Sequence, residues 1–382
     1  GIFVLPAIVA SVLGAASVFA YIFCGILISL VMLCFAEVGS KVTTSGGVYT
    51  YIQTSFGPYF GFLTMILFGI SVISADAAVA NAIFDVVASI FPFLKLGYAK
   101  ILFFMIVFGG LGYINVKGIR QGINLVKFMT VSKLIPLLLL VLFSLSEVSL
   151  SNLSIESAPG VLDIGKACLI LFFAFQGAEN ALSIGGEVKN PRKTIPRAIL
   201  IGVSCVLITY MLIQMVAQGV LGDTLPEFKE SPLSTLAETV IGPIGFTLLT
   251  IGAAVSMFGA LSSDVLSVPR VFFRASADHV LPFKALSKVH PKFATPYIAV
   301  ICYASLDFIF ASVGGFQQLA IISSATILLV YLGVSVSVIK LRRINGSNSK
   351  KDDFKIPGGY LVPILSAAII VWLLSNLTQD QA

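Results

Sequence analysis

Residues 169–191 read LILFFAFQGAENALSIGGEVKNP, and their apolar character stops halfway along the run. The polar cluster, which falls where a helix would cross the middle of a bilayer, consists of Gln176, Gly177, Glu179 and Asn180. A helix that unwinds beside a cavity tolerates such a cluster, because its freed backbone groups can bind a polar ligand. An unbroken helix whose polar groups are satisfied by neighbouring helices remains the alternative at this point. In both cases the stretch predicts a membrane helix whose polar residues face the protein interior.

The rest of the chain has the composition of a membrane protein. Of its 382 residues, 57% are hydrophobic and 11% are charged, with a mean hydropathy of +1.01. This excludes soluble enzymes and nucleic-acid-binding modules, which carry about 25% charged residues. Since a helix needs about 20 apolar residues to cross a bilayer, there is material for about eleven spans. The apolar runs predict helices near 1–13, 15–38, 59–91, 98–116, 121–145, 161–187, 195–221, 240–273, 296–313, 315–340 and 360–377.

Positive charge is distributed unevenly between the two sides of these spans. If the loops alternate, 19 of the 24 lysines and arginines fall on one side, 4 fall on the other, and Lys133 lies inside a span. The positive-inside rule makes the richer side cytoplasmic, so the N-terminal end is expected there. This asymmetry also explains the net charge of +6 without a nucleic-acid partner. The five cysteines lie in apolar runs and are expected to be small core residues.

The spans divide into two sets of five, residues 1–145 and 161–343, followed by an extra helix over 360–377. Each set begins with a candidate break, GIFVLPA at residues 1–7 and the cluster at Gln176. Asp76 and Asp264 both lie in the third helix of their set, at membrane depth, where a carboxylate costs about 2.5–3.5 kcal/mol. We therefore expect an inverted repeat with both aspartates in a shared cavity.

Four motifs together resemble the amino acid–polyamine–organocation (APC) superfamily of permeases. They are GIFVLPA (1–7), LCFAEVGSKVTTSGGVYTYIQTSFGPYFGF (33–62), FFAFQGAENALSIGGEVKNPRKTIPRAI (172–199), and PRVFFRASADHVLP with HPKFATPY (269–282 and 290–297). The resemblance covers essentially the whole chain and implies an all-α membrane protein with a 5+5 inverted repeat and discontinuous helices 1 and 6. Members usually have a twelfth span and a segment before Gly1, so the chain is expected to be truncated at both ends.

The resemblance also implies a site between the first and sixth helices. Backbone amides of Gly1 and Ile2 would hold an α-carboxylate at a helix N-terminus, where the dipole is positive. Around the break at Gly177, carbonyl oxygens of Phe173, Ala174 and Gln176 would accept hydrogen bonds from the α-ammonium group. Phe175, or Phe173, would close over the substrate, and Glu179 would take part in proton-sensitive gating. No cofactor and no metal are expected.

Charged residues inside the spans suggest the substrate and the coupling ion. Lys133 is too deep in its span to reach an interface readily, and by resemblance it stands where sodium-coupled relatives hold sodium. We therefore expect sodium-independent, proton-coupled symport of amino acids, with cationic ones favoured by Asp76 and Asp264. An amino acid exchanger is the first alternative, and one aspartate could instead carry a proton or pair with Lys133. A channel or a membrane-embedded enzyme is more remote, and Asp307 has no obvious role. A bacterial plasma membrane is the expected location.

Overall fold

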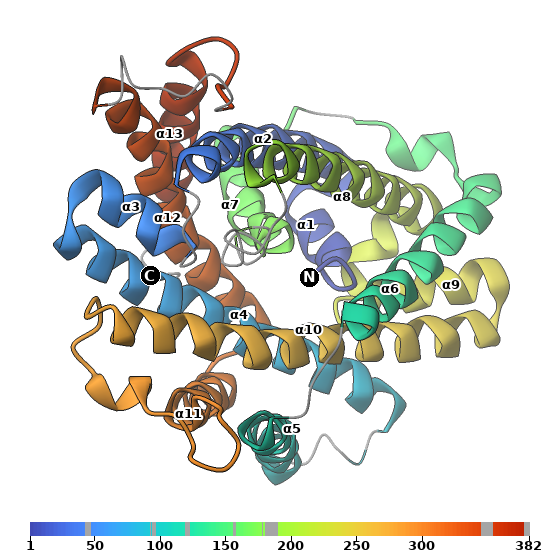
Figure 1. The fold of residues 1–382 in the computed structure, drawn as a ribbon. Helices are drawn as coiled ribbons and strands as arrows, with labels where there is room; N and C mark the ends of the chain where they lie inside the picture. Colours follow the sequence, from blue (N-terminus) through green and yellow to red (C-terminus); the bar gives the residue numbers. More distant parts are fainter. Residues whose placement is uncertain are drawn as a thin grey trace.

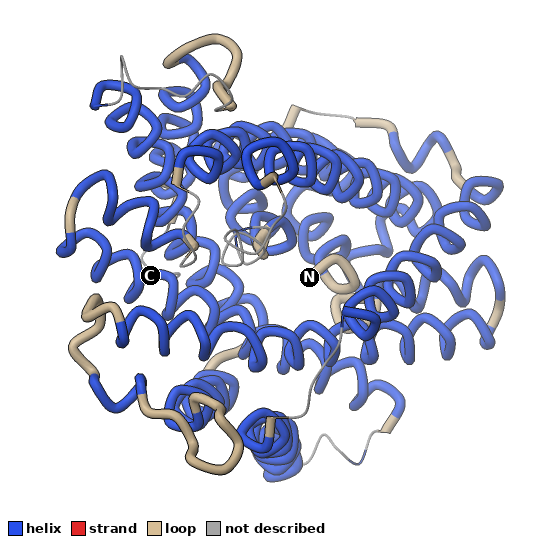
Figure 2. The backbone as a smooth tube through the Cα atoms, viewed as in Figure 1, coloured by secondary structure: helices blue, strands red, loops and turns tan. Residues whose placement is uncertain are grey.

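The computed structural model describes residues 1–42, 47–91, 93, 97–118, 123–155, 158–177, 179, 190–344 and 354–377. Across these residues the chain forms helices and connecting loops, without a strand (Figure 2). The α-helices are α1 (Leu5–Leu13), α2 (Ser17–Lys41), α3 (Val48–Phe56), α4 (Pro58–Ile90), α5 (Gly97–Lys117), α6 (Ile123–Ser144), α7 (Val161–Phe172), α8 (Pro191–Leu221), α9 (Pro232–Ile241), α10 (Pro243–Ala277), α11 (Tyr297–Val313), α12 (Phe316–Ile344) and α13 (Leu361–Leu374).

Each of the eleven predicted helical regions contains an observed α-helix. The region predicted over 161–187 is helical only as far as Phe172, and residue 178 and residues 180–187 lie outside the described part of the chain. Among the described residues, six helical stretches are long and apolar enough to cross a membrane: Leu5–Lys41, Pro58–Ala88, Tyr98–Lys117, Lys193–Glu227, Pro243–Ala277 and Phe316–Ile344. The short helices α3 and α9 were not predicted, and each precedes a long helix that begins with proline at its first position.

The helices are arranged in layers around α1 and α7. Helices α2 and α8 pack along one side of this pair, and α4 and α10 lie along the other, with α5 and α11 outside them (Figure 1). Helix α12 packs against α4, and α13 packs against α12 and α2. The contacting pairs α1–α7, α2–α8, α4–α10 and α5–α11 join equivalent positions of the two expected half-repeats. A two-fold axis would produce this pairing, although the repeat itself stays a prediction.

Small residues allow close helix crossings, as is usual for helices packed within a membrane. At the α2–α8 crossing, a Cβ added to Gly25 would clash with Cδ1 of Leu207, so the Leu207 side chain would have to move to admit a larger residue. Cys24 and Cys168 are also buried near this region. Cys205 and Cys302 are exposed instead, so the expectation that all five cysteines are core residues is wrong for these two. Apolar side chains that face lipid and those that face the core cannot be distinguished by composition.

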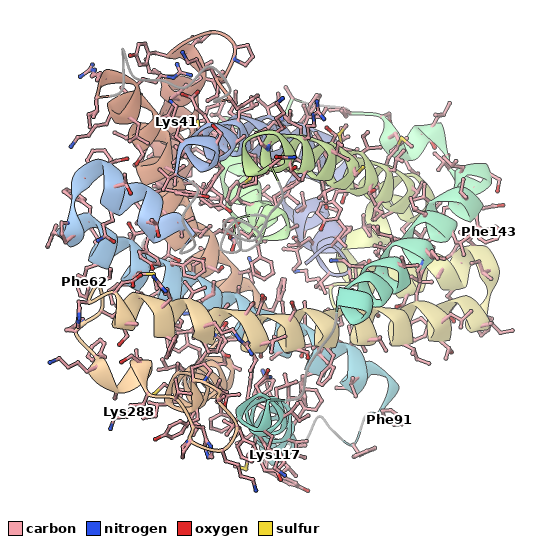
Figure 3. The ribbon with its side chains drawn as sticks, in the orientation of Figure 1. Lys41, Phe62, Phe91, Lys117, Phe143 and Lys288 are labelled. Atoms are coloured by element: carbon pink, nitrogen blue, oxygen red, sulfur yellow. The ribbon has the colours of Figure 1, made fainter. Side chains whose placement is uncertain are left out.

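A buried ionic network lies at one end of the bundle. Glu37, near the end of α2, is fully buried, and its carboxylate accepts hydrogen bonds from Arg342 Nε (2.7 Å), Lys41 Nζ (2.7 Å) and the backbone N–H of Ile356 (2.9 Å). These groups come from α2, from the end of α12 and from the segment leading to α13. Lys41 is labelled at the end of α2 in Figure 3. Glu37 therefore fastens three parts of the chain together.

Candidate functional site

A cavity of about 160 Å³ lies between α1, α4, the end of α7, α8 and α10. Most of its wall is apolar, but several charged and hydroxyl groups reach it. The lining residues are Gly1, Ile2, Phe3, Ser71, Val72, Ala75, Asp76, Val79, Lys133, Phe173, Ala174, Gln176, Gly177, Glu179, Tyr210, Ser256, Met257, Ala260 and Asp264. Ten of the eleven residues singled out from the sequence are among them. Phe175 is the exception: its buried ring packs against Tyr210, at 5.4 Å between ring centroids.

The helix that carries the polar cluster does break. Regular α-helix ends at Phe172, a single 3-10 turn covers Phe173–Phe175, and the backbone of Gln176 is extended (ψ 160°). Gly177 follows with φ +109°, a conformation that side chains other than hydrogen rarely allow. The interrupted stretch therefore lines the cavity with backbone that has left its helical hydrogen bonding. Of the two readings of this stretch, the broken helix is correct.

The start of α1 meets this break directly. A Cβ built on Gly1 would lie 3.6 Å from the Cα of Ala174, so the two backbones approach each other closely. The carbonyl of Gly1 accepts hydrogen bonds from the N–H groups of Val4 (3.1 Å) and Leu5 (3.3 Å). Within the described part of the chain, the N–H groups of Ile2 and Phe3 have no partner. They lie just before the N-terminus of a helix, where partial positive charge favours an anion.

Hydrogen bonds from α12 hold the broken segment in place. The side-chain amide of Gln176 donates to Oγ of Ser324 (3.1 Å) and accepts from Oγ of Ser323 (2.8 Å). The carboxylate of Glu179 accepts from the Tyr331 hydroxyl (2.5 Å) and from the N–H of Gly177 (3.1 Å). Glu179 therefore spans the break and ties it to α12.

The two aspartates predicted to share a cavity lie together in it. Asp76, on α4, and Asp264, on α10, both line it, and the Tyr303 hydroxyl donates to Oδ2 of Asp76 at 2.9 Å. Asp76 is buried and Asp264 is half-buried. Two carboxyl groups therefore meet this cavity from facing helices.

Asp307 lies behind this pair, outside the cavity. It is fully buried one helical turn after Tyr303 on α11, and both of its carboxyl oxygens lack a partner among the described residues. Sequence reasoning found no place for Asp307 and did not single out Tyr303. The i to i+4 spacing of these residues puts them on one face of α11, but nothing in the sequence said that this face meets α4.

Lys133 contributes the positive charge of the cavity. It is half-buried on α6, and it makes no hydrogen bond or ion pair with the part of the chain that the structure describes. Its side chain therefore reaches the cavity wall rather than the end of the span. The hydroxyl groups of Ser71, Ser256 and Tyr210 complete the polar part of the lining.

The chain matches the family model described as "Amino acid permease" over residues 1–379. The chain belongs to the amino acid permease family. It is 30% identical to the serine/threonine exchanger SteT of Bacillus subtilis, over 96% of this chain and 84% of that protein. The branched-chain amino acid permease BcaP of the same organism is 26% identical over 99% and 84%. An arginine/ornithine antiporter of Pseudomonas aeruginosa is 27% identical over 63% of this chain and 52% of its own length.

Family membership confirms the resemblance to APC permeases that the motifs carried. The permease is an integral membrane protein of amino acid transport, not an enzyme. Its relatives differ in the substrates they are named for, which span hydroxyl, branched-chain and cationic side chains.

Proposed function

We propose that the permease is a secondary active transporter that moves amino acids by alternating access, with cationic amino acids favoured. The observation that carries this proposal is the meeting of the start of α1 with the broken segment after α7 at one small cavity. The unpaired N–H groups of Ile2 and Phe3 suit the substrate carboxylate. Backbone carbonyls of Phe173 and Ala174 on the opposite wall suit the ammonium group.

The Asp76–Asp264 pair supports the preference for a cationic side chain. Both carboxyl groups line the same cavity as these backbone groups, and no described arginine lines the cavity. A guanidinium or ammonium group from the substrate would pair with these carboxyl groups. Lys133 lines the same cavity and repels a cationic side chain, so its position suits coupling rather than substrate binding. This makes Lys133 the coupling residue for sodium-independent proton symport.

Counterflow tests the substrate preference. Proteoliposomes preloaded with unlabelled arginine are assayed for uptake of radiolabelled arginine, with a panel of amino acids as competitors. Lysine and ornithine should compete, and Asp264→Asn should weaken arginine binding at least tenfold, since a charge-assisted hydrogen bond contributes about 1.5–3 kcal/mol. Asp223→Asn removes an exposed carboxylate outside the cavity and is the matched control. Competition by neutral amino acids, with none by lysine, refutes the cationic preference.

Obligate exchange is the second candidate, and the relatives support it. One is named a serine/threonine exchanger and another an arginine/ornithine antiporter. The hydroxyl groups of Ser71, Ser256 and Tyr210 in the cavity also suit a small polar side chain. Empty vesicles with an inward proton gradient and no sodium separate the mechanisms. Symport fills them, whereas exchange needs an amino acid inside.

We also propose a helix arrangement, an orientation and a location for the permease in the membrane. The contacts between equivalent helices support a 5+5 inverted repeat, with residues 1–145 and 161–343 as its halves. The uneven distribution of lysine and arginine supports a cytoplasmic N-terminal end. The Bacillus subtilis relatives support a bacterial plasma membrane as its location. Accessibility of single introduced cysteines to a membrane-impermeant reagent tests this orientation.

A further inference from the structure

A second cavity, of about 450 Å³, opens on the flank of the bundle where α4, α10 and α11 meet. No charged side chain is among the described residues that line it, and the polar side-chain groups among them are those of Cys302 and Tyr303. Exposed apolar side chains stand at its mouth, among them Ile66, Phe283 and Leu306. Because α4 and α10 contain membrane-spanning stretches, this mouth faces the hydrocarbon region rather than water.

One end of the cavity is formed by the loop between α10 and α11, which includes the 3-10 turn η8 (Lys284–Ser287). Phe283, Ala285 and Leu286 contribute to the wall, and Lys284 stands between the first two in the sequence. Lys288 follows two residues after Leu286, at the edge of the bundle beside α10 and α11 (Figure 3). The cavity therefore joins an apolar interior to a basic rim.

The charge of this rim is not neutralised by the protein. Lys284 and Lys288 are exposed, and neither forms an ion pair with any described residue. The one acidic residue in the loop, Asp278, is already engaged by Arg274 Nε at 2.9 Å and by the Tyr49 hydroxyl at 3.2 Å. An anion brought to this rim would meet two free ammonium groups. Basic side chains at the membrane surface attract anionic lipid headgroups in this way.

We propose that this cavity binds an anionic phospholipid, with one acyl chain inside the cavity and the headgroup phosphate at Lys284 and Lys288. The cavity wall runs from Ile298 to Leu306 along α11, about 12 Å at the helical rise of 1.5 Å per residue. An acyl chain entering beside η8 therefore has an apolar path that leads away from the basic rim. The volume lies within the range of about 300–1,000 Å³ that is typical of small-molecule sites.

The lipid site adjoins the central cavity through one residue. Tyr303 lines the lipid cavity and packs against Phe272, at 6.1 Å between ring centroids, while its hydroxyl donates to Asp76 in the other cavity. An acyl chain in the lipid cavity would contact Tyr303 on its membrane side. Lipid binding at this site is independent of which amino acid the permease carries, because it can be measured without transport.

Photolabelling of the purified protein in phosphatidylcholine vesicles tests the site. Phosphatidylglycerol with a diazirine on one acyl chain is added in trace amount, irradiated, and its attachment mapped by peptide mass spectrometry. Labelling should concentrate on residues 278–306 and on the first half of α4, and excess unlabelled phosphatidylglycerol should remove most of it. Even labelling of all exposed helices, or equal competition by added phosphatidylcholine, overturns the proposal.

Two pairs of variants make the test specific. Lys284→Gln with Lys288→Gln should reduce labelling at least threefold, whereas Arg343→Gln with Lys355→Gln removes the same charge near α12 and α13 and should leave it unchanged. Cys302→Trp should fill the cavity and reduce labelling, and Ile251→Trp places the same indole ring at an exposed position on α10 outside the cavity. Ile298→Trp fills the cavity from another side if Cys302→Trp does not fold. Undiminished labelling in the lysine pair, or in every folded cavity-filling variant, overturns the proposal.

Discussion

Replacement of Glu37 by glutamine should destabilise the permease more than any change to an exposed ion pair. The substitution leaves Arg342 and Lys41 without their counter-ion, and their side chains are only 15% and 8% exposed. Removing one partner from a buried ionic network costs about 3–5 kcal/mol, because the remaining charge stays desolvated. An exposed pair contributes about 0–1 kcal/mol. The comparison is Asp278→Asn, since Asp278 pairs with Arg274 at a site where the side chains are 36% and 60% exposed.

The single tryptophan of the chain provides the assay. Trp372, on α13, packs edge-on against Phe23 of α2 at 5.2 Å between ring centroids, so its fluorescence reports whether α13 remains seated on α2. In detergent, the apparent melting temperature of Glu37→Gln should fall by about 4–6 °C, since an unfolding entropy of about 2.1 cal/mol/K per residue gives roughly 1.2 °C per kcal/mol for a chain of 382 residues. The melting temperature of Asp278→Asn should fall by about 2 °C or less. If the melting temperatures of the two variants fall by the same amount, the buried network does not hold α2, α12 and the segment before α13 together.

Three further outcomes follow from single positions. Lys133→Ala should make amino acid uptake independent of pH; uptake that remains pH-dependent removes Lys133 from coupling. Gly25→Val should destabilise the fold by about 1–3 kcal/mol by overpacking against Leu207, seen as a lower melting temperature. Burial and the Asp278 carboxylate raise the pKa of Tyr49 to about 12. Its stabilising effect should be present below about pH 10 and lost as the pH rises towards 12. Tyr49→Phe should lack this alkaline step in a melting series.

The positions of the long helices were predictable because bilayer thickness sets the length of an apolar run. The break after Phe172 was predictable as well, since Gln176 and Glu179 are too polar for an intact lipid-facing helix. The partners of these groups on α12, Ser323 and Tyr331, were not. A helix in a membrane is apolar on both its lipid-facing and its core-facing side, so periodicity does not reveal which face meets which neighbour.

The same limit explains why Tyr303 was missed and why Asp307 had no role. Their positions on α11 become meaningful only when this helix is seen against α4, and no local pattern in the sequence records that contact. The short helices α3 and α9 were missed for a different reason. Residues 48–56 and 232–241 form helices of 9 and 10 residues, which are too short to stand out as membrane-crossing runs of about 20 residues.

The fastening of Gln176 to α12 also has a dynamic consequence. Both ends of its amide are engaged by serines of that helix, and Glu179 adds a third bond through Tyr331. At about 0.5–1.5 kcal/mol each, three such bonds make separation of the segment from α12 roughly a 1.5–4.5 kcal/mol event. The segment and α12 therefore stay joined in all but roughly a tenth of molecules or fewer. No comparable hydrogen bond in the described chain joins Gly1–Phe3 to α12, so α1 can move relative to α12 without breaking these three bonds.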